Sequence, residues 1–208
     1  DKGRTDGGNT AYDHCVYTRE EVQRLAKKGF ELAMQRSKKL CCVDKANVLE
    51  TSRLWRETVQ AMEKDYPEVT VSYEFVDAVA MRLVQWPNSY DVLITENLFG
   101  DILTDEASVI SGSMGLMPSA SIGLKTSLFE PIHGSYPQAA GKDIANPLAT
   151  VLSAAMMFED AFQLKTEAQA IRDVVNKSLA EGIVTEDLSD GGKSYKTSEV
   201  GDWLAAHV

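Results

Sequence analysis

The sequence predicts an α/β fold, and three observations point to it. Short apolar runs alternate with longer segments whose apolar residues recur at helical spacing, which is the pattern of βαβ units. Polar residues follow several of the strand-like runs directly, as they do where parallel strands end at a binding edge. With 44% hydrophobic residues, the 208-residue chain can bury a sizeable core as one large domain or two small ones.

The first half of the chain shows the alternation most clearly. Residues 1–15 are polar and glycine-rich, which predicts a loop or an extended arm. Thr18 and Glu21 form a capping box that begins an amphipathic helix, and basic residues favour its end near residue 39. The next expected elements are a strand at 40–43, a helix around 54–62, a strand at 69–76, a helix at 80–84, a strand at 92–95 and a helix that carries Asp101 and Asp105.

The second half is expected to be mostly helical. Residues 111–123 are too rich in Gly and Ser for a long helix, so we expect a crossover there and a domain boundary near Gly112, which gives domains 1–111 and 112–208. Asn146 can cap a helix whose first turn contains Pro147. The remaining elements are a short strand near 128–129, a loop at 133–147 and helices at 148–162, 166–181 and 198–206.

Charge and composition exclude several classes of partner. The net charge of −10, with 21 basic residues scattered among acidic ones, argues against nucleic acid. The longest apolar runs fall far short of the roughly 20 residues of a membrane helix. The spacing of the three cysteines suits neither a disulfide framework nor zinc, so we expect reduced thiols in a cytoplasmic protein. A small anionic substrate stays compatible with this charge.

Polar candidates converge on the edge where the predicted parallel strands end. Lys45, Asp77, Asn97 and Asp101 all follow or lie close to the end of a strand-like run. Asp101 and Asp105 are four residues apart, which puts both carboxylates on one helical face. Alone, such a pair is more often a solvated face. With Asp77 as a third carboxylate, it would suit Mg²⁺ or Mn²⁺ better than zinc.

Six segments of the chain resemble one enzyme family, and they occur in the same order. The segments are DKANVL (44–49), VDA (76–78), NLFGDILTDEAS (97–108), GSMGLMPSAS (112–121), EPIHGS (130–135) and GKDIANP (141–147). In these segments the chain resembles the isocitrate and isopropylmalate dehydrogenases. The resemblance implies a mixed sheet flanked by helices without a Rossmann glycine fingerprint, and here one nearly whole domain plus part of a second.

The resemblance also implies a reaction. Asp77, Asp101 and Asp105 would bind Mg²⁺ or Mn²⁺, which would chelate the 2-hydroxyl and carboxylate of a malate-like 2-hydroxy dicarboxylic acid. Lys45 would be the catalytic lysine that takes the hydroxyl proton and, with Asp77, would contact the substrate. The alternative for Lys45 is a surface lysine paired with Asp44.

The DKANVL segment bears on the choice of substrate. The resemblance places Asn47 at the nicotinamide and Val48 at the variable side chain of the substrate. A valine there favours an isopropyl group over carboxymethyl or hydroxyl, although such contacts discriminate by only about 1–3 kcal/mol. Related tartrate, homoisocitrate or isocitrate dehydrogenases and a non-catalytic dimerisation or regulatory module stay as alternatives.

The resemblance implies NAD as cofactor. The residues that match the family's cofactor-binding positions are Asn47, Glu130, His133, Gly134, Ser135, Gln138 and Asn146. Gln138 stands where members that use NAD commonly carry an Asp, and an amide lacks the charge that would repel the 2′-phosphate of NADP. The basic residue expected for NADP is also missing from 136–140, so we expect NAD.

Two further expectations follow from the family. The resemblance implies a homodimer in which Lys45 and Asp77 of one chain complete the site of the other, with the N-terminal residues as part of an interlocking arm. It also implies a preceding N-terminal portion that carries substrate-binding arginines and a catalytic tyrosine. We therefore expect the 208 residues alone to have little or no turnover.

Overall fold

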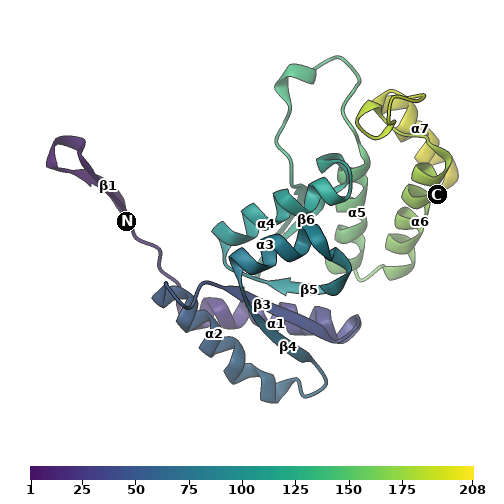
Figure 1. The fold of residues 1–208 in the computed structure, drawn as a ribbon. Coiled ribbons are helices and arrows are strands. Elements are labelled where there is room, and N and C mark those ends of the chain that lie inside the picture. Colours follow the sequence, from purple (N-terminus) through teal and green to yellow (C-terminus); the bar gives the residue numbers. More distant parts are fainter. The chain divides into compact units, whose positions relative to one another are not determined.

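The computed structural model describes residues 1–208 and divides into two compact units. Unit 1 comprises Asp1–Glu106 and unit 2 comprises Ala107–Val208, and each is described by itself (Figure 1). The division falls inside helix α4 (Asn97–Ile110). The predicted boundary near Gly112 stays a prediction, but both units contain helices and strands, which confirms the α/β class.

Unit 1 begins with a hairpin and continues as alternating helices and strands. The hairpin pairs β1 with β2 antiparallel in the segment where a loop or extended arm was predicted. The capping box of Thr18 and Glu21 begins α1 as predicted. The elements are β1 (Lys2–Thr5), β2 (Thr10–Asp13), α1 (Arg19–Gln35), β3 (Lys39–Asp44), α2 (Glu50–Met62), β4 (Thr70–Phe75), α3 (Val76–Gln85), β5 (Val92–Ile94) and the start of α4.

A three-stranded parallel sheet in the order β4-β3-β5 forms the centre of unit 1. Successive residues of β3 point to opposite faces, so one strand contributes to two cores. Leu40 and Cys42 pack with α1 and α2, whereas Cys41 and Val43 pack with α3 and Leu103 of α4. Both faces of the central strand are therefore buried, which explains why its sequence is continuously apolar.

The boundary between β4 and α3 differs from the prediction. The strand-like run 69–76 was expected to end at Asp77, with a helix from residue 80, but α3 already starts at Val76. Asp77 therefore lies in the first turn of a helix, where a negative charge is favoured by the helix dipole. The β-branched valines at 69, 71 and 76 hid this change of backbone, because they suit a strand as well.

Unit 2 contains a two-stranded antiparallel sheet and three helices after the end of α4. Strand β6 was missed, since glycines on both sides suggested a crossover loop; it starts with Pro118 and pairs only with β7, which is where proline is tolerated. Helix α5 packs against both strands and against α6. The elements are β6 (Pro118–Ile122), β7 (Ser127–Pro131), α5 (Leu148–Asp160), α6 (Lys165–Glu181) and α7 (Thr197–His207).

Candidate active site

Lys45 follows β3 directly and is held at the carboxyl end of the sheet. Its backbone N–H donates to Ser52 Oγ at 3.0 Å. The neighbouring Asp44 is only 1% exposed and is occupied by Arg56, whose Nε and Nη2 donate to its two oxygens at 2.8 and 3.1 Å. The alternative in which Lys45 pairs with Asp44 is therefore wrong, because Arg56 takes that carboxylate.

The partner of Lys45 is Asp77 at the start of α3. The Lys45 ammonium donates a hydrogen bond to the Asp77 carboxylate and forms an ion pair with it. This hydrogen bond holds the pKa of Asp77 below its ordinary value. Lys45 Nζ also lies 5.5 Å from the ring centroid of Phe75. The structure thus brings together a lysine and a carboxylate predicted for proton transfer and metal binding.

Asn47 and Val48 lie in the turn that follows Lys45. The Val48 N–H donates to Lys45 O at 2.9 Å, and Arg53 Nε donates to Ala46 O at 2.9 Å, which fixes the turn against α2. The Val48 side chain is 61% exposed. An apolar residue is therefore exposed in the turn after Lys45, where the resemblance predicts the contact with the variable part of the substrate.

Asp101 and Asp105 are exposed residues of α4. Asn97 Nδ2 donates to Asp101 Oδ2 at 2.9 Å, so one oxygen of this carboxylate is oriented by the residue one turn before it. The oxygen donors of the two aspartates fit Mg²⁺ or Mn²⁺. However, no group of three or more His, Cys, Asp or Glu side chains in this chain is arranged to hold a metal ion. Asp77 as the third ligand stays a prediction.

Unit 2 contains a cavity of about 690 Å³ that includes four of the predicted cofactor residues. The predicted residues that line it are His133, Gly134, Ser135 and Asn146. Glu130 in β7 and Gln138 in the short 3₁₀ helix Pro137–Ala139 do not line it. The other lining residues are Met114, Gly115, Tyr136, Ile144, Ala145, Glu186 and Asp187.

Asp187 organises this cavity, and the sequence analysis did not identify it. It accepts hydrogen bonds from Asn146 Nδ2 at 2.9 Å, from Thr185 Oγ1 at 2.5 Å and from the Ser113 hydroxyl. Burial raises the pKa of Asp187, but these hydrogen bonds together hold it below its ordinary value. The sequence did not mark this aspartate, because two of its three partners, Ser113 and Asn146, come from distant segments of the chain.

Asn146 and Gly115 show how closely the cavity walls approach each other. Asn146 Oδ1 accepts the N–H of Leu148, the first residue of α5, at 2.9 Å, while its amide donates to Asp187. The sequence predicted this bond, but Pro147 precedes the helix rather than lying in its first turn. A Cβ placed on Gly115 would lie 2.6 Å from Asn146 Cβ. Only glycine therefore permits this approach. One asparagine thus serves both the start of a helix and the wall of a cavity.

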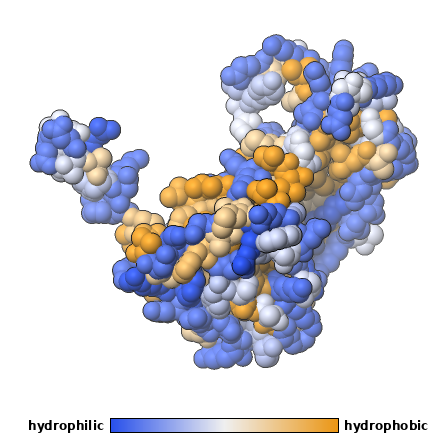
Figure 2. Space-filling view, viewed as in Figure 1, coloured by the Kyte–Doolittle hydropathy of each residue, from blue (hydrophilic) through white to orange (hydrophobic).

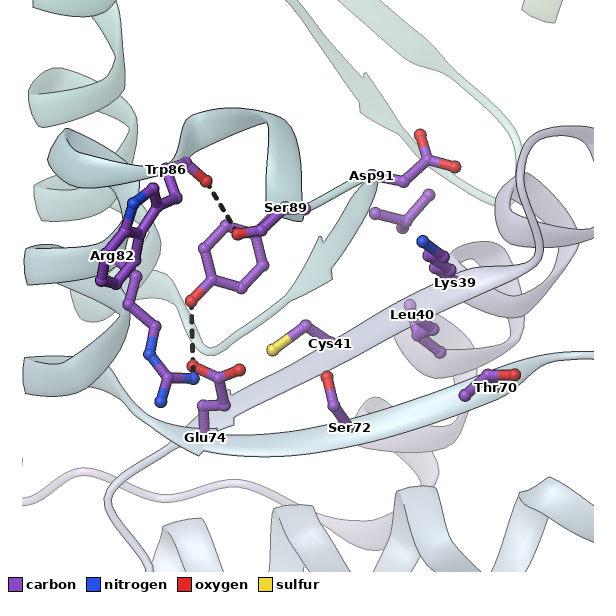
Figure 3. Close-up of a pocket in the computed structure, with 12 residues that line it drawn as sticks. Lys39, Leu40, Cys41, Thr70, Ser72, Glu74, Arg82, Trp86, Ser89 and Asp91 are labelled. Carbon is purple, nitrogen blue, oxygen red and sulfur yellow. Dashed lines mark hydrogen bonds and ion pairs between the residues drawn. The ribbon is translucent and has the colours of Figure 1, made fainter.

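A second hollow lies in unit 1, away from the predicted site residues (Figure 3). Its volume is about 490 Å³, and it opens between β4, the end of α3 and the start of β5. Glu74 accepts a hydrogen bond from the Tyr90 hydroxyl at 2.9 Å and pairs with Arg82 at 2.7 Å. Two of the charged residues that line this hollow, Glu74 and Arg82, are thus paired with each other. No helix of the structure is long and apolar enough to cross a membrane.

The comparisons with known proteins agree with the fold and show the family. Residues 1–204 match the model of the isocitrate/isopropylmalate dehydrogenase family, and the chain belongs to that family. It is 56% identical over 199 residues to a 3-isopropylmalate dehydrogenase of Bacteroides fragilis, which covers 95% of this chain and 56% of that protein. It is 52% identical over 207 residues to a 3-isopropylmalate dehydrogenase of Desulfitobacterium hafniense, and this match covers 99% of this chain and 59% of that protein. The chain thus spans less than two thirds of these relatives.

Solved structures show the same relationship. An isocitrate dehydrogenase from Methylococcus capsulatus superimposes with a TM-score of 0.91 at 36% identity, covering 96% of this chain and 59% of the other. A β-decarboxylating dehydrogenase from Thermococcus kodakarensis superimposes with a TM-score of 0.86 at 35% identity, covering 100% of this chain and 60% of the other. The resemblance inferred from six sequence segments is confirmed.

Proposed function

We propose that the protein to which this chain belongs is a 3-isopropylmalate dehydrogenase that acts in leucine biosynthesis. It would oxidise and decarboxylate 3-isopropylmalate to 4-methyl-2-oxopentanoate with NAD. The observation that carries the proposal is Lys45, which is held at the carboxyl end of the sheet and paired with Asp77. Two relatives, at 56% and 52% identity, bear the name of this enzyme.

The residues of the chain have distinct roles in this reaction. Lys45 would take the proton of the 2-hydroxyl in its neutral amine form, and Asp77 contacts its side-chain nitrogen and orients it beforehand. Asp77, Asp101 and Asp105 would hold Mg²⁺ or Mn²⁺, which as a Lewis acid favours loss of the hydroxyl proton and withdraws electrons from the 2-oxo group. NAD would accept the hydride from the hydroxyl-bearing carbon, and CO₂ would leave from the β-position with a proton taking its place.

The cavity of unit 2 supports NAD rather than NADP. Its lining contains the carboxylates of Glu186 and Asp187 and no Lys or Arg side chain. A 2′-phosphate in such a cavity would meet negative charge without a cation to pair with it. The cavity therefore supports NAD independently of Gln138, on which the sequence argument depended.

A homodimer with shared sites is also part of the proposal. The three predicted metal ligands do not form a cluster within one chain, so a second chain is the natural source of the missing carboxylate. Helices α3 and α4 also expose apolar side chains, and Figure 2 shows apolar surface over these helices. Met81 and Leu98 are each 63% exposed, and Ile102 is 57% exposed. Contact between two copies of this face would remove apolar surface from water.

The second candidate is a related 2-hydroxy acid dehydrogenase, which the structural likeness to an isocitrate dehydrogenase supports. The test is a substrate profile of the protein expressed from its complete coding sequence, with Mn²⁺ and NAD. We expect NADH to form fastest with 3-isopropylmalate, because Val48 offers an apolar contact. Faster turnover of isocitrate, homoisocitrate or tartrate would contradict the proposal, and no turnover with any of them would favour the non-catalytic module.

A further inference from the structure

Three consecutive backbone N–H groups at the start of α4 are satisfied by two side chains. The first N–H groups of a helix have no partner within the helix. Here Leu98 N–H donates to Glu96 Oε2 at 3.2 Å and Phe99 N–H to Glu96 Oε1 at 3.3 Å. Asn97 N–H donates to the hydroxyl of Tyr17 at 3.3 Å. A residue 80 positions earlier thus takes part in starting this helix.

Glu96 needs this outside support. Glutamate is not among the preferred residues for this helix-starting position, because its longer side chain must be ordered to reach back to the backbone. The Tyr17 hydroxyl donates to Glu96 Oε2 at 2.8 Å and so fixes the carboxylate. Burial and this hydrogen bond raise the pKa of Tyr17 to about 12, so the hydroxyl keeps its proton and can donate at neutral pH.

The ring of Tyr17 is anchored separately from its hydroxyl. It packs against the core of unit 1 and lies edge-on to Trp55, with ring centroids 5.7 Å apart. Trp55 is 4% exposed and belongs to α2, the helix that follows Lys45 and its turn. Tyr17 thus connects the core under the Lys45 turn with the start of α4.

The same helix start leads to Asp101. Asn97 is the first residue of α4, and its side chain donates to Asp101 Oδ2 at 2.9 Å. A shift of Asn97 would therefore change the orientation of that carboxylate. We propose that Tyr17 is a positioning residue for the metal site: through Glu96 and Asn97 it fixes where α4 begins and how Asp101 is presented to the cation.

This inference rests on the proposed function, because it assumes that Asp101 binds Mg²⁺ or Mn²⁺. Groups that orient metal ligands typically change metal affinity about 10–100-fold when they are removed. Tyr17 acts through two intermediate residues, so a loss on the order of five- to ten-fold is expected. The Tyr17→Phe variant keeps the ring on Trp55 and removes only the hydroxyl.

The experiment uses the protein from the complete coding sequence and Mn²⁺ as the probe. Free Mn²⁺ is titrated by electron paramagnetic resonance, and amide hydrogen exchange is followed for the segment 97–100. For Tyr17→Phe we expect Mn²⁺ to bind on the order of five- to ten-fold more weakly, and we expect the amides of this segment to exchange faster. The control is Tyr66→Phe, whose ring stacks on Phe30 in the same core at 4.5 Å. It should leave both readouts unchanged.

The outcomes separate the two proposals. Wild-type turnover of 3-isopropylmalate together with unchanged Mn²⁺ affinity in Tyr17→Phe would overturn the positioning role alone. Normal Mn²⁺ binding without turnover of any 2-hydroxy acid would overturn the proposed function alone, and a wild-type protein that binds no Mn²⁺ would overturn both. If Tyr17→Phe does not fold, Glu96→Gln provides the test, because it keeps the shape and removes the charge; unchanged Mn²⁺ affinity there would also overturn the role.

Discussion

The two units present their candidate residues in different ways. In unit 1 the side chains predicted for metal and proton transfer lie at exposed edges, and the structure forms two separate pairs, Lys45 with Asp77 and Asn97 with Asp101. In unit 2, residues from distant segments line one cavity, and the side chains of Asn146 and Asp187 are hydrogen-bonded to each other there. Unit 2 thus contains an organised pocket by itself, whereas the predicted metal ligands of unit 1 do not form one group within this chain.

The largest effect is expected in unit 1, from Asp101→Asn in the complete protein. Loss of one charged oxygen ligand should lower activity and Mn²⁺ affinity together, by at least about 100-fold. Removal of a group that only orients a metal ligand already lowers metal affinity by up to about 100-fold. Steady-state rates over a range of Mn²⁺ concentrations measure both. The control Asp202→Asn, on an exposed position of α7, should behave like wild type. Retained activity at low Mn²⁺ would contradict the role of Asp101 as a ligand.

A smaller effect is expected in unit 2, from Asp187→Asn. This change removes the negative charge that accepts three hydrogen bonds in the cavity wall, and hydrogen bonds to charged groups contribute about 1.5–3 kcal/mol each. We expect NADH to bind about ten-fold more weakly, as measured by its fluorescence, with the maximal rate less affected. Asp190→Asn serves as control because Asp190 lies outside the cavity and asparagine tolerates its positive φ of 47°. Unchanged NADH binding would show that the cavity is not organised by Asp187.

The smallest effect concerns the acid stability of unit 1 away from either site. Hydrogen bonds from the Ser37 side chain and backbone, and then from Arg36, lower the pKa of Asp91 to about 2. A lowered folded-state pKa stabilises the protein above the unfolded value near 3.8, and this contribution is lost as the pH falls toward 2.

Asp91→Asn should therefore lower the free energy of unfolding at pH 5 on the order of 1 kcal/mol, since its partner Arg36 is exposed. At pH 2.5 the difference from wild type should be smaller. Urea unfolding of the 208-residue chain at the two pH values measures it, with the exposed Asp65→Asn as control. A difference that grows on acidification would have the wrong sign.

Local patterns predicted much of the fold. The sequence predicted the capping box at Thr18 and the role of Asn146 at the start of α5, because each depends on residues within three positions of one another. The sequence did not show where α3 starts, because the valines near that point also suit a strand. It did not show strand β6 either, because this strand is defined by its pairing with β7. Contacts along the chain can be inferred from spacing, whereas contacts across it cannot.

The sequence by itself determined the α/β class and the family, since motif order and residue type carry that information, and it predicted Lys45, Asp77, Asp101 and His133 as site residues. Only the tertiary structure decided which groups meet. In the structure, hydrogen bonds join Asp44 to Arg56 and Asp77 to Lys45. Further hydrogen bonds join Asp187 to Asn146 and Glu96 to Tyr17. These pairs join residues 12 to 79 positions apart, and no spacing rule connects them. They form because the packed sheet and helices bring distant polar groups within hydrogen-bonding distance, where each must find a partner.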